Sequence, residues 1–282
     1  MKTKSSKRIR DIIYYVFVIS LGFTMLYPVL WLVSSSLKPE PEIFGNAVSL
    51  IPSEIDWMNY VEGWAGFGGI GFGTYFRNTF IIVGIVVIGT LLTGSVVAYG
   101  FARLEFRGKA ILFACLMATL MLPIQVTLIP QYIVFNNIGW VNTFYPLIIP
   151  AFVGGQPFFI FLMIQFIRGI PKELDEAAIV DGATKMQIFW KIILPLLKPA
   201  LVTVAIFSFM WTWDDFMGPL IYLNNASLHT VSLALRNFMD ATGSTNWGPL
   251  LAMSTLSIIP QIVLFLIFQK QIVGGIATTG LK

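Results

Sequence analysis

Residues 78–102 read NTFIIVGIVVIGTLLTGSVVAYGFA, a run that contains no charged side chain. An α-helix needs roughly 20 mostly apolar residues to cross the hydrocarbon core of a bilayer. A membrane strand would instead alternate apolar and polar residues over about ten positions. The unbroken apolar character of this run therefore predicts a membrane-spanning helix.

Five further apolar runs flank this one on both sides. They cover residues 12–34 before it, and 110–135, 144–167, 199–223 and 250–273 after it. Of the 282 residues, 56% are hydrophobic and only 11% are charged, whereas a soluble domain carries about a quarter charged residues. We predict an all-α integral membrane protein with six transmembrane helices, folded as a single domain over residues 1–282.

The lysines and arginines predict how the chain is oriented, because cytoplasmic loops of membrane proteins carry an excess of both. With residues 1–11 in the cytoplasm, only Lys38, Arg77 and Arg236 of the 18 lysines and arginines lie outside. Both termini are therefore expected in the cytoplasm. A basic start before an apolar run also fits a cleaved signal peptide. The run exceeds the usual 7–15 apolar residues of such a peptide, so an uncleaved first helix is favoured.

Several function classes have no support in the sequence. One histidine, His229, and one cysteine, Cys115, exclude a multi-histidine metal site and an internal disulfide. The phosphate-binding pattern Gly-x-x-x-x-Gly-Lys-Ser/Thr is missing, as are the Gly-x-Ser-x-Gly and His-Glu-x-x-His patterns. A net charge of +4 does not suggest nucleic-acid binding. We expect neither a metal nor a nucleotide on this chain.

The loop of residues 168–198 is unlike the others, and residues 169–195 within it read GIPKELDEAAIVDGATKMQIFWKIILP. Pro171 suits the first turn of a helix, and the acids that follow suit its positive end. Gly182 permits the positive φ that ends a helix, and a second helix is predicted over residues 183–193. Two short helices joined at a glycine suit docking to a soluble partner. An amphipathic loop lying on the lipid surface fits these observations equally well.

A spaced set of residues in this loop resembles the EAA loop of binding-protein-dependent ATP-binding-cassette (ABC) importer permeases, and residues 168–198 are called the EAA loop from here on. The resemblance implies a coupling helix: Glu176 would enter a cleft of a separate ATPase subunit, Ala177 and Ala178 would allow close contact, and Gly182 would make the bend. The full coupling set comprises Glu176, Ala177, Ala178, Asp181, Gly182, Ile192, Leu194 and Pro195.

The resemblance extends over most of the chain and is strongest to the carbohydrate-uptake branch, in particular to the MalG-like member of its permease pairs. The segments that carry it are Tyr27-Pro28, Leu37-Lys38-Pro39, Phe106-Arg107-Gly108-Lys109, Leu122-Pro123 with Gln125 and Pro130, Gly139-Trp140 with Asn142-Thr143, Pro219-Leu220-Ile221-Tyr222, and Gln269-Lys270 with Val273, Gly275, Gly280 and Lys282.

This resemblance implies the permease subunit of an importer that moves a sugar, expected to be an oligosaccharide, into the cytoplasm by alternating access. It implies that the chain lies in a bacterial or archaeal cell membrane, in contact with membrane lipid. The implied partners are a second permease subunit, two ATP-binding subunits that hold ATP and magnesium, and an extracytoplasmic sugar-binding protein. The chain itself would bind no cofactor and would catalyse no reaction.

Asp214 and Asp215 lie inside the predicted fifth helix, where a charge costs on the order of 2.5–3.5 kcal/mol on insertion scales. They should face protein or water, and they could bind sugar hydroxyls with Trp211 and Trp213 stacking nearby. A structural role is favoured for them. The third helix offers Gln125 and Tyr132 as weaker candidates for the sugar path.

Two rival functions remain at this point. A secondary transporter would have only Asp214 and Asp215 for coupling to an ion gradient, and an intramembrane enzyme would act alone. Both leave the EAA loop unexplained. His229 is expected to be a solvated residue or a docking contact in an outside loop.

Overall fold

The computed structural model describes residues 4–154, 156–239 and 245–279. The regular structure in these ranges is helical, and β-pairing within them is limited to one isolated bridge between Phe67 and Ile70. The predicted all-α class is confirmed. Contacts divide the chain into two compact units, one of residues 1–72 and 235–259 and one of residues 73–234 and 260–282. The expectation of one domain stays a prediction.

The first unit is dominated by one long helix. Its elements are α1 (Lys4–Ser35), α2 (Glu40–Gly45), α3 (Met58–Ala65), η3 (Leu235–Phe238) and the start of α15 (Trp247–Thr279). The predicted first span lies inside α1, and no side chain described between residues 10 and 33 is buried. A helix this apolar and this exposed needs lipid or another subunit around it.

The segment after α1 folds back on the end of that helix around a buried cation. Lys38 has no exposed surface, and its Nζ donates to the carbonyl oxygens of Asn46 at 3.0 Å and Ser49 at 2.7 Å. Trp31 of α1 donates from Nε1 to the carbonyl oxygen of Ala47 at 2.7 Å. Buried charges need such partners, so these bonds determine the path of residues 38–49.

The second unit contains the remaining helices. They are α4 (Phe72–Arg103), α5 (Lys109–Met121), α6 (Ile124–Asn137), α7 (Tyr145–Phe152), α8 (Pro157–Arg168), α9 (Glu173–Val180), α10 (Lys185–Ile188), η1 (Phe189–Ile193), α11 (Leu194–Leu196), α12 (Lys198–Asp214), α13 (Met217–Tyr222), η2 (Ala226–Leu228) and α14 (Val231–Ala234), followed by the end of α15.

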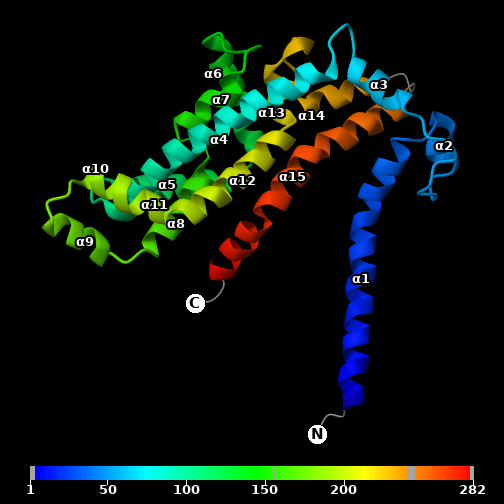
Figure 1. Cartoon of the computed structure of the whole chain (residues 1–282). Helices are drawn as coiled ribbons and strands as arrows, with labels where there is room; N and C mark the ends of the chain where they lie inside the picture. Colours follow the sequence, from blue (N-terminus) through cyan, green and yellow to red (C-terminus); the bar gives the residue numbers. More distant parts are fainter. Residues whose placement is uncertain (1–3, 155, 240–244, 280–282) are drawn as a thin grey trace. The chain divides into compact units, whose positions relative to one another are not determined.

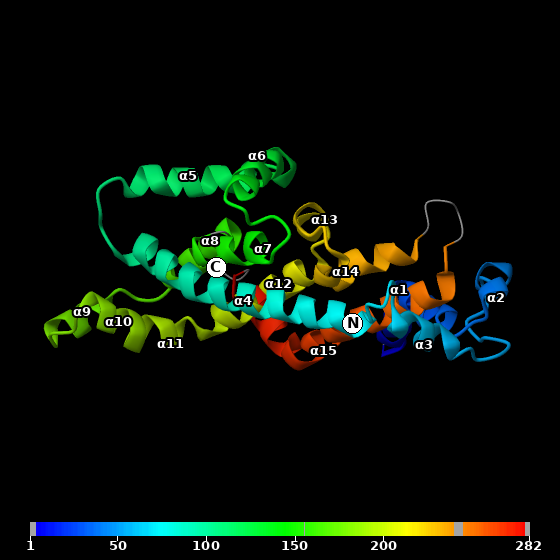
Figure 2. The same cartoon turned by 90° about the horizontal axis from the view of Figure 1, so that it is seen from above.

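The main core of this unit joins α4, α8 and α12 to the EAA loop. Figures 1 and 2 show these three helices side by side, with α9 and α10 at one end. Gly94 lets α4 approach α8 closely, because a Cβ there would collide with the terminal methyl of Met163. Phe159, Met163 and Ile193 have no exposed surface in this core.

The candidate membrane spans overlap the six predicted ones, but two candidates are bent helix pairs. The pair Lys185–Leu196 with Lys198–Asp214 coincides with only the first part of the predicted span at residues 199–223. Four helical stretches within the described ranges are long and apolar enough to cross a membrane, and two bent helix pairs raise the number to six. The unbroken stretches include the predicted spans at residues 12–34 and 78–102, and the stretch Trp247–Gln269 covers most of the predicted span at 250–273. The predicted span at 144–167 consists of α7 and α8, which together form one candidate span.

The predicted span over residues 110–135 is sharply bent. The chain turns by 106° between α5 and α6, because Leu122 and Pro123 have extended backbones with ψ of 122° and 135°. Proline lacks an N–H and disfavours the α conformation in the residue before it, so the helix ends at Met121.

A continuous helix over residues 199–223 is contradicted. α12 ends at Asp214, Asp215 has an extended backbone with ψ of 116°, and α13 begins only at Met217. At its other end α12 is bent by 72° from the stretch Lys185–Leu196. This second bend lies between Pro195 and Pro199, and prolines often mark such breaks in a helix.

Candidate functional site

The EAA loop forms two short helices joined at a glycine, as the sequence predicted. α9 ends at Val180, and Gly182 adopts φ of +82°, a value that L-residues with a Cβ rarely adopt. Thr184 then starts α10 with a capping box: its hydroxyl accepts from the N–H of Gln187, whose side chain accepts from the N–H of Thr184.

The second helix of the loop differs from the prediction in its winding. Residues 185–188 are α-helical, but residues 189–193 form a π-helical turn, with the N–H of Leu194 donating to the carbonyl oxygen of Phe189. Pro195 has no N–H to continue the usual ladder, which favours the wider turn here.

Several coupling residues present an exposed face on this helix pair. Glu176 and Ala177 are exposed on α9, and Asp181 and Gly182 are exposed at the bend. Large apolar side chains with free surface surround them, namely Leu174, Ile179, Val180, Met186 and Trp190. Exposed apolar surface of this kind suits contact with a partner or with lipid.

Ala178 does not belong to that face. It is 9% exposed and lies in the core cluster with Tyr99 of α4 and Ile193 of η1. The expectation that Ala178 allows close approach of a partner is therefore corrected: its small side chain lets α9 approach the core of its own chain. Leu194 is half-buried, and Pro195 is exposed.

A hollow of about 370 Å³ lies at the bend of the loop. Its lining comprises Asp181, Gly182, Ala183, Gln187, Lys191 and Ile192. Three of these residues belong to the predicted coupling set. The hollow combines an acid, a base and an amide, so it suits a polar group of a partner rather than a lipid chain.

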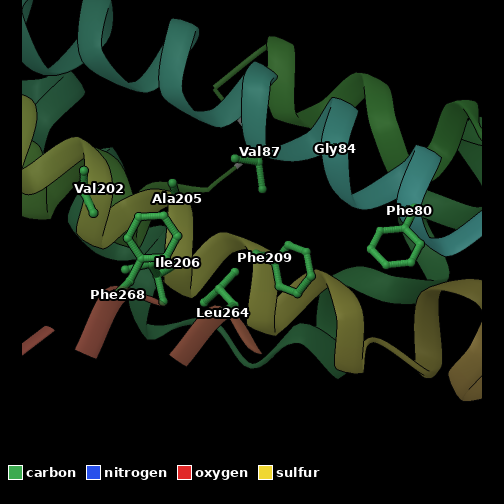
Figure 3. A pocket seen from close by; sticks show the side chains of 9 residues that line it. All are labelled: Phe80, Gly84, Val87, Val202, Ala205, Ile206, Phe209, Leu264 and Phe268. Atoms are coloured by element: carbon green, nitrogen blue, oxygen red, sulfur yellow. The ribbon is translucent and has the colours of Figure 1, made fainter. Parts of the chain in front are cut away.

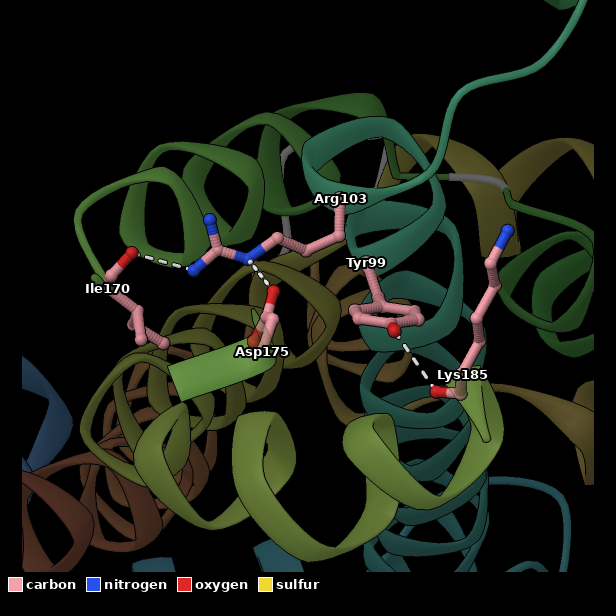
Figure 4. A network of polar contacts seen from close by, with 5 residues as sticks. All are labelled: Tyr99, Arg103, Ile170, Asp175 and Lys185. Carbon is pink, nitrogen blue, oxygen red and sulfur yellow. Dashed lines mark hydrogen bonds and ion pairs between the residues drawn. The ribbon is translucent and has the colours of Figure 1, made fainter. Parts of the chain in front are cut away.

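A buried polar network connects the EAA loop to the last turns of α4, as Figure 4 shows. Arg103 Nε lies 2.9 Å from Asp175 Oδ2, with the two side chains 4% and 15% exposed. A second guanidinium nitrogen donates to the carbonyl oxygen of Ile170 at 2.6 Å. One turn earlier on α4, the hydroxyl of Tyr99 donates to the carbonyl oxygen of Lys185 at 3.0 Å.

This network was not predicted from the sequence, in which Arg103 counts only as one of the basic loop residues. Two features of the sequence could have suggested the ion pair: Arg103 directly follows an apolar run, and Asp175 directly precedes Glu176. Nearby, the ammonium of Lys109 lies 2.9 Å from Glu105 and lowers the pKa of that exposed carboxyl. That second ion pair does not involve the EAA loop.

The two adjacent acids of the predicted sugar path have different surroundings. Asp214, the last residue of α12, is exposed, and its Oδ1 accepts a hydrogen bond from Nε2 of Gln261 on α15 at 2.8 Å. Asp215 is half-buried, and its Oδ1 accepts from the N–H of Gly218 at 3.1 Å. Its carbonyl oxygen accepts from the hydroxyl of Ser232 at 2.6 Å. Asp215 thus organises the break after α12, whereas Asp214 remains accessible.

The two tryptophans of this region also separate. Trp211 is 50% exposed and lies 4.9 Å from the ring of Phe159. Trp213 is only 3% exposed and packs against Phe80 and Phe209. Trp213 is buried in this conformation and offers no free ring face to a sugar, while Trp211 keeps a free surface.

The weaker candidates in the third span lie beyond the bend, on α6. Gln125 is exposed one residue after the start of α6. Tyr132 is 36% exposed and stacks on Tyr222 of α13, with ring centroids 6.3 Å apart. In the described residues, neither the Gln125 nor the Tyr132 side chain contacts Asp214.

A cavity of about 290 Å³ with an apolar lining lies between α4, α12 and α15 (Figure 3). Its lining comprises Phe80, Gly84, Val87, Val202, Ala205, Ile206, Phe209, Leu264 and Phe268. None of these side chains can form a hydrogen bond with a sugar hydroxyl, so this cavity is not a sugar site. The described residues also contain no group of three metal-ligating side chains.

His229 lies between η2 and α14, where the amide of Asn78 donates to its carbonyl oxygen at 3.1 Å. Burial lowers the pKa of the His229 imidazole, and a hydrogen bond from the imidazole to the backbone of Leu223 opposes part of that shift. The residue is half-buried, so its side chain is only partly solvated, and its role as a docking contact stays a prediction.

Comparisons with known proteins agree with this arrangement. A family model described as binding-protein-dependent transport system inner membrane component matches residues 90–277. The chain is 37% identical to a probable ABC transporter permease protein, YurM, of Bacillus subtilis, over 95% of this chain and 87% of that one. It is 30% identical to the trehalose/maltose transport system permease protein MalG of Thermococcus litoralis, over 97% and 98%.

A solved structure has the same fold. In a bacterial ABC transporter involved in the import of the acidic polysaccharide alginate, one chain superposes with a TM-score of 0.80 at 23% identity. The superposition covers 96% of this chain and 98% of that one.

Proposed function

The chain belongs to the family of binding-protein-dependent transport system inner membrane components, and on this premise we propose that it is the permease subunit of an ABC importer that carries a sugar into the cell. The observation that carries the proposal is the EAA loop, whose spaced residues form an exposed helix pair with Glu176 at its surface. A relative named for trehalose and maltose supports a sugar of two or more units.

The EAA loop is proposed to dock on a separate ATPase subunit that holds the ATP and magnesium. Glu176, Ala177 and the bend at Gly182 would form the contact. Exposed apolar surface and a polar hollow on the same loop support a protein partner of mixed character. The alternative of a loop lying on lipid is disfavoured because the hollow is polar.

The remaining partners follow from the same premise. A second permease subunit would cover exposed apolar surface such as that of α1, an extracytoplasmic protein would deliver the sugar, and both termini would lie in the cytoplasm. The mechanism would be alternating access, with ATP binding closing the ATPase pair and moving the EAA loop. The exposed Asp214 and Trp211 are proposed to line the sugar path.

The first test is purification through a tag on this chain from its own membranes in mild detergent, with mass spectrometry of the proteins that accompany it. We expect an ATPase with a phosphate-binding loop and a second permease. Transport by the chain alone would overturn the proposal.

A second test changes the loop itself. Glu176→Lys is expected to abolish ATP-driven uptake while the subunit stays in the membrane, because the variant places the wrong charge at the contact. Glu173→Lys, an exposed acid on the same helix outside the coupling set, is the matched control. Equal uptake by wild type and Glu176→Lys would refute the assignment of the loop.

A further inference from the structure

Two contacts on the inner side of the EAA loop join opposite halves of the loop to one helix. Arg103 of α4 binds Asp175 and the carbonyl oxygen of Ile170, both before the bend at Gly182. Tyr99, one turn earlier on α4, binds the carbonyl oxygen of Lys185 after the bend. Figure 4 shows both contacts entering the loop from α4.

Asp175 and Glu176 are adjacent but face in different directions. Successive residues of an α-helix point about 100° apart, so a helix with one face toward its own protein can present the next residue outward. Asp175 is largely buried against Arg103, whereas Glu176 is exposed. α9 therefore lies between α4 and any partner that docks on Glu176.

Burial makes this ion pair difficult to separate. The Arg103 side chain is 4% exposed, and Arg103 Nε and Asp175 Oδ1 are both buried without a hydrogen-bond partner in the described residues, so charge attraction holds the pair. Removing either charge leaves the other buried and uncompensated, which is far less favourable than losing an exposed pair. The loop and the end of α4 should therefore move together.

The other end of α4 is also held by specific bonds. Asn78 donates from Nδ2 to the carbonyl oxygens of Ser227 and His229 at 2.9 and 3.1 Å. The hydroxyl of Thr79 accepts from the N–H of Val231 at 2.9 Å. α4 has 32 residues, so it spans about 48 Å at 1.5 Å per residue. It thus joins the EAA loop to the segment of residues 227–232, where Ser232 in turn binds the break after Asp214.

From these contacts we propose that Arg103 is a positioning residue that locks the EAA loop to α4, so that a displacement of the loop by the ATPase moves α4 as one rigid body. This inference rests on the proposed function, and it adds to that function the route by which the loop acts on the membrane helices. Tyr99 is the second attachment, on the far side of the Gly182 bend.

The test uses the whole complex, purified through this chain and reconstituted in liposomes. ATP hydrolysis and the uptake of radiolabelled trehalose are measured in parallel. If wild type does not accumulate trehalose, the assay uses the sugar that it does accumulate from a panel of di- and oligosaccharides. For Arg103→Ala we expect the ATPase subunits to remain bound and hydrolysis to continue. The sugar moved per ATP should fall at least about tenfold, within the range usual for coupling between two sites.

Three variants separate coupling from folding. Asp175→Asn should lower the amount of sugar moved per ATP in the same way. The double variant Arg103→Asp with Asp175→Arg, which exchanges the two charges, should restore part of the lost sugar transport per ATP. Tyr99→Phe should give a smaller loss, since it removes one attachment only. Glu105→Gln is the matched control, because this exposed acid forms its ion pair with Lys109 and is affected by the EAA loop only through the charge of Lys172, the weakest influence on its carboxyl. Its ratio of sugar to ATP should equal that of wild type. If Arg103→Ala fails to assemble with the ATPase subunits, the sugar moved per ATP is compared between Asp175→Asn and Glu105→Gln, and that comparison decides whether the ion pair couples the two sites.

Two results would overturn the inference. One is an unchanged ratio of sugar to ATP in Arg103→Ala and Asp175→Asn. The other is loss of the ATPase subunits from these variants, which would mean that the ion pair only shapes the docking face. Failure of the proposed function gives a different result, since wild-type uptake would then not depend on ATP at all.

Discussion

Gln261 of α15 donates from Nε2 to Oδ1 of Asp214 at 2.8 Å, and this bond joins the last residue of α12 to a second membrane helix. Asp214 remains exposed despite the bond. Broken helices with free polar groups are where membrane transporters usually bind their substrates. The pair is therefore the best polar candidate for the sugar path in the second unit.

Asp214→Ala is expected to reduce the maximal rate of ATP-driven uptake by about tenfold, because a hydrogen bond to a charged group contributes about 1.5–3 kcal/mol. The half-saturating sugar concentration should change little, since the extracytoplasmic binding protein captures the sugar first. Asp215→Ala is the control and should lower thermal stability instead, because it removes the oxygen that accepts from the N–H of Gly218. An unchanged maximal rate in Asp214→Ala would remove Asp214 from the path.

Gly182 offers a prediction about backbone conformation alone. No atom lies within 4 Å of a Cβ built at this residue, but its φ is +82°. An L-residue in a left-handed conformation costs roughly 1–2 kcal/mol, so the effect of substitution should follow backbone preference rather than side-chain size. Coupled uptake should decrease in the order Gly182→Asn, Gly182→Ala, Gly182→Val, because asparagine tolerates positive φ and β-branched residues do not. Equal uptake by the asparagine and valine variants would contradict this account.

Lys38 should be important for the stability of the first unit. Lys38→Met keeps most of the side-chain volume but removes the donors to the carbonyl oxygens of Asn46 and Ser49. We expect the free energy of unfolding to fall by about 2 kcal/mol, the usual effect of losing hydrogen bonds to a charged group. The midpoint of thermal unfolding in detergent measures this, with the exposed Arg236→Met as a control for loss of charge. A shift no larger than that of the control would show that the ammonium is dispensable.

His229 should make stability depend on pH. Burial lowers its pKa in the folded protein below the unfolded value of about 6.5. The folded state therefore binds fewer protons than the unfolded state, so the contribution is present above pH 6.5 and is lost as the pH falls below 6.5 and through the lower pKa of the folded protein. Wild type should lose more stability between pH 7.5 and 5.5 than His229→Gln does, measured by thermal unfolding of the purified complex. Parallel loss in both proteins would exclude His229 as the titrating group.

Some features of this protein follow from local sequence alone. A backbone in lipid must satisfy its own hydrogen bonds, so apolar runs such as residues 78–102 have to be helical. Gly182 ends α9 with positive φ because few other residues tolerate that conformation. The spacing from Glu176 to Pro195 is sufficient to mark the EAA loop. Each of these features depends on residues close together in the chain.

Other features depend on which distant segments meet, and local patterns carry no information about that. Asp214 and Asp215 are neighbours, yet the break after α12 leaves one exposed and gives the other a structural bond to Gly218. Ala178 looks like its neighbour Ala177, but packing on the core of its own chain buries it. The pairing of Arg103 with Asp175 exists only because α4 and α9 come together in the fold. The sequence by itself thus determined the helical character, the bend at Gly182 and the family. The tertiary structure decided which side of each helix faces protein, because burial depends on neighbours far away in the chain.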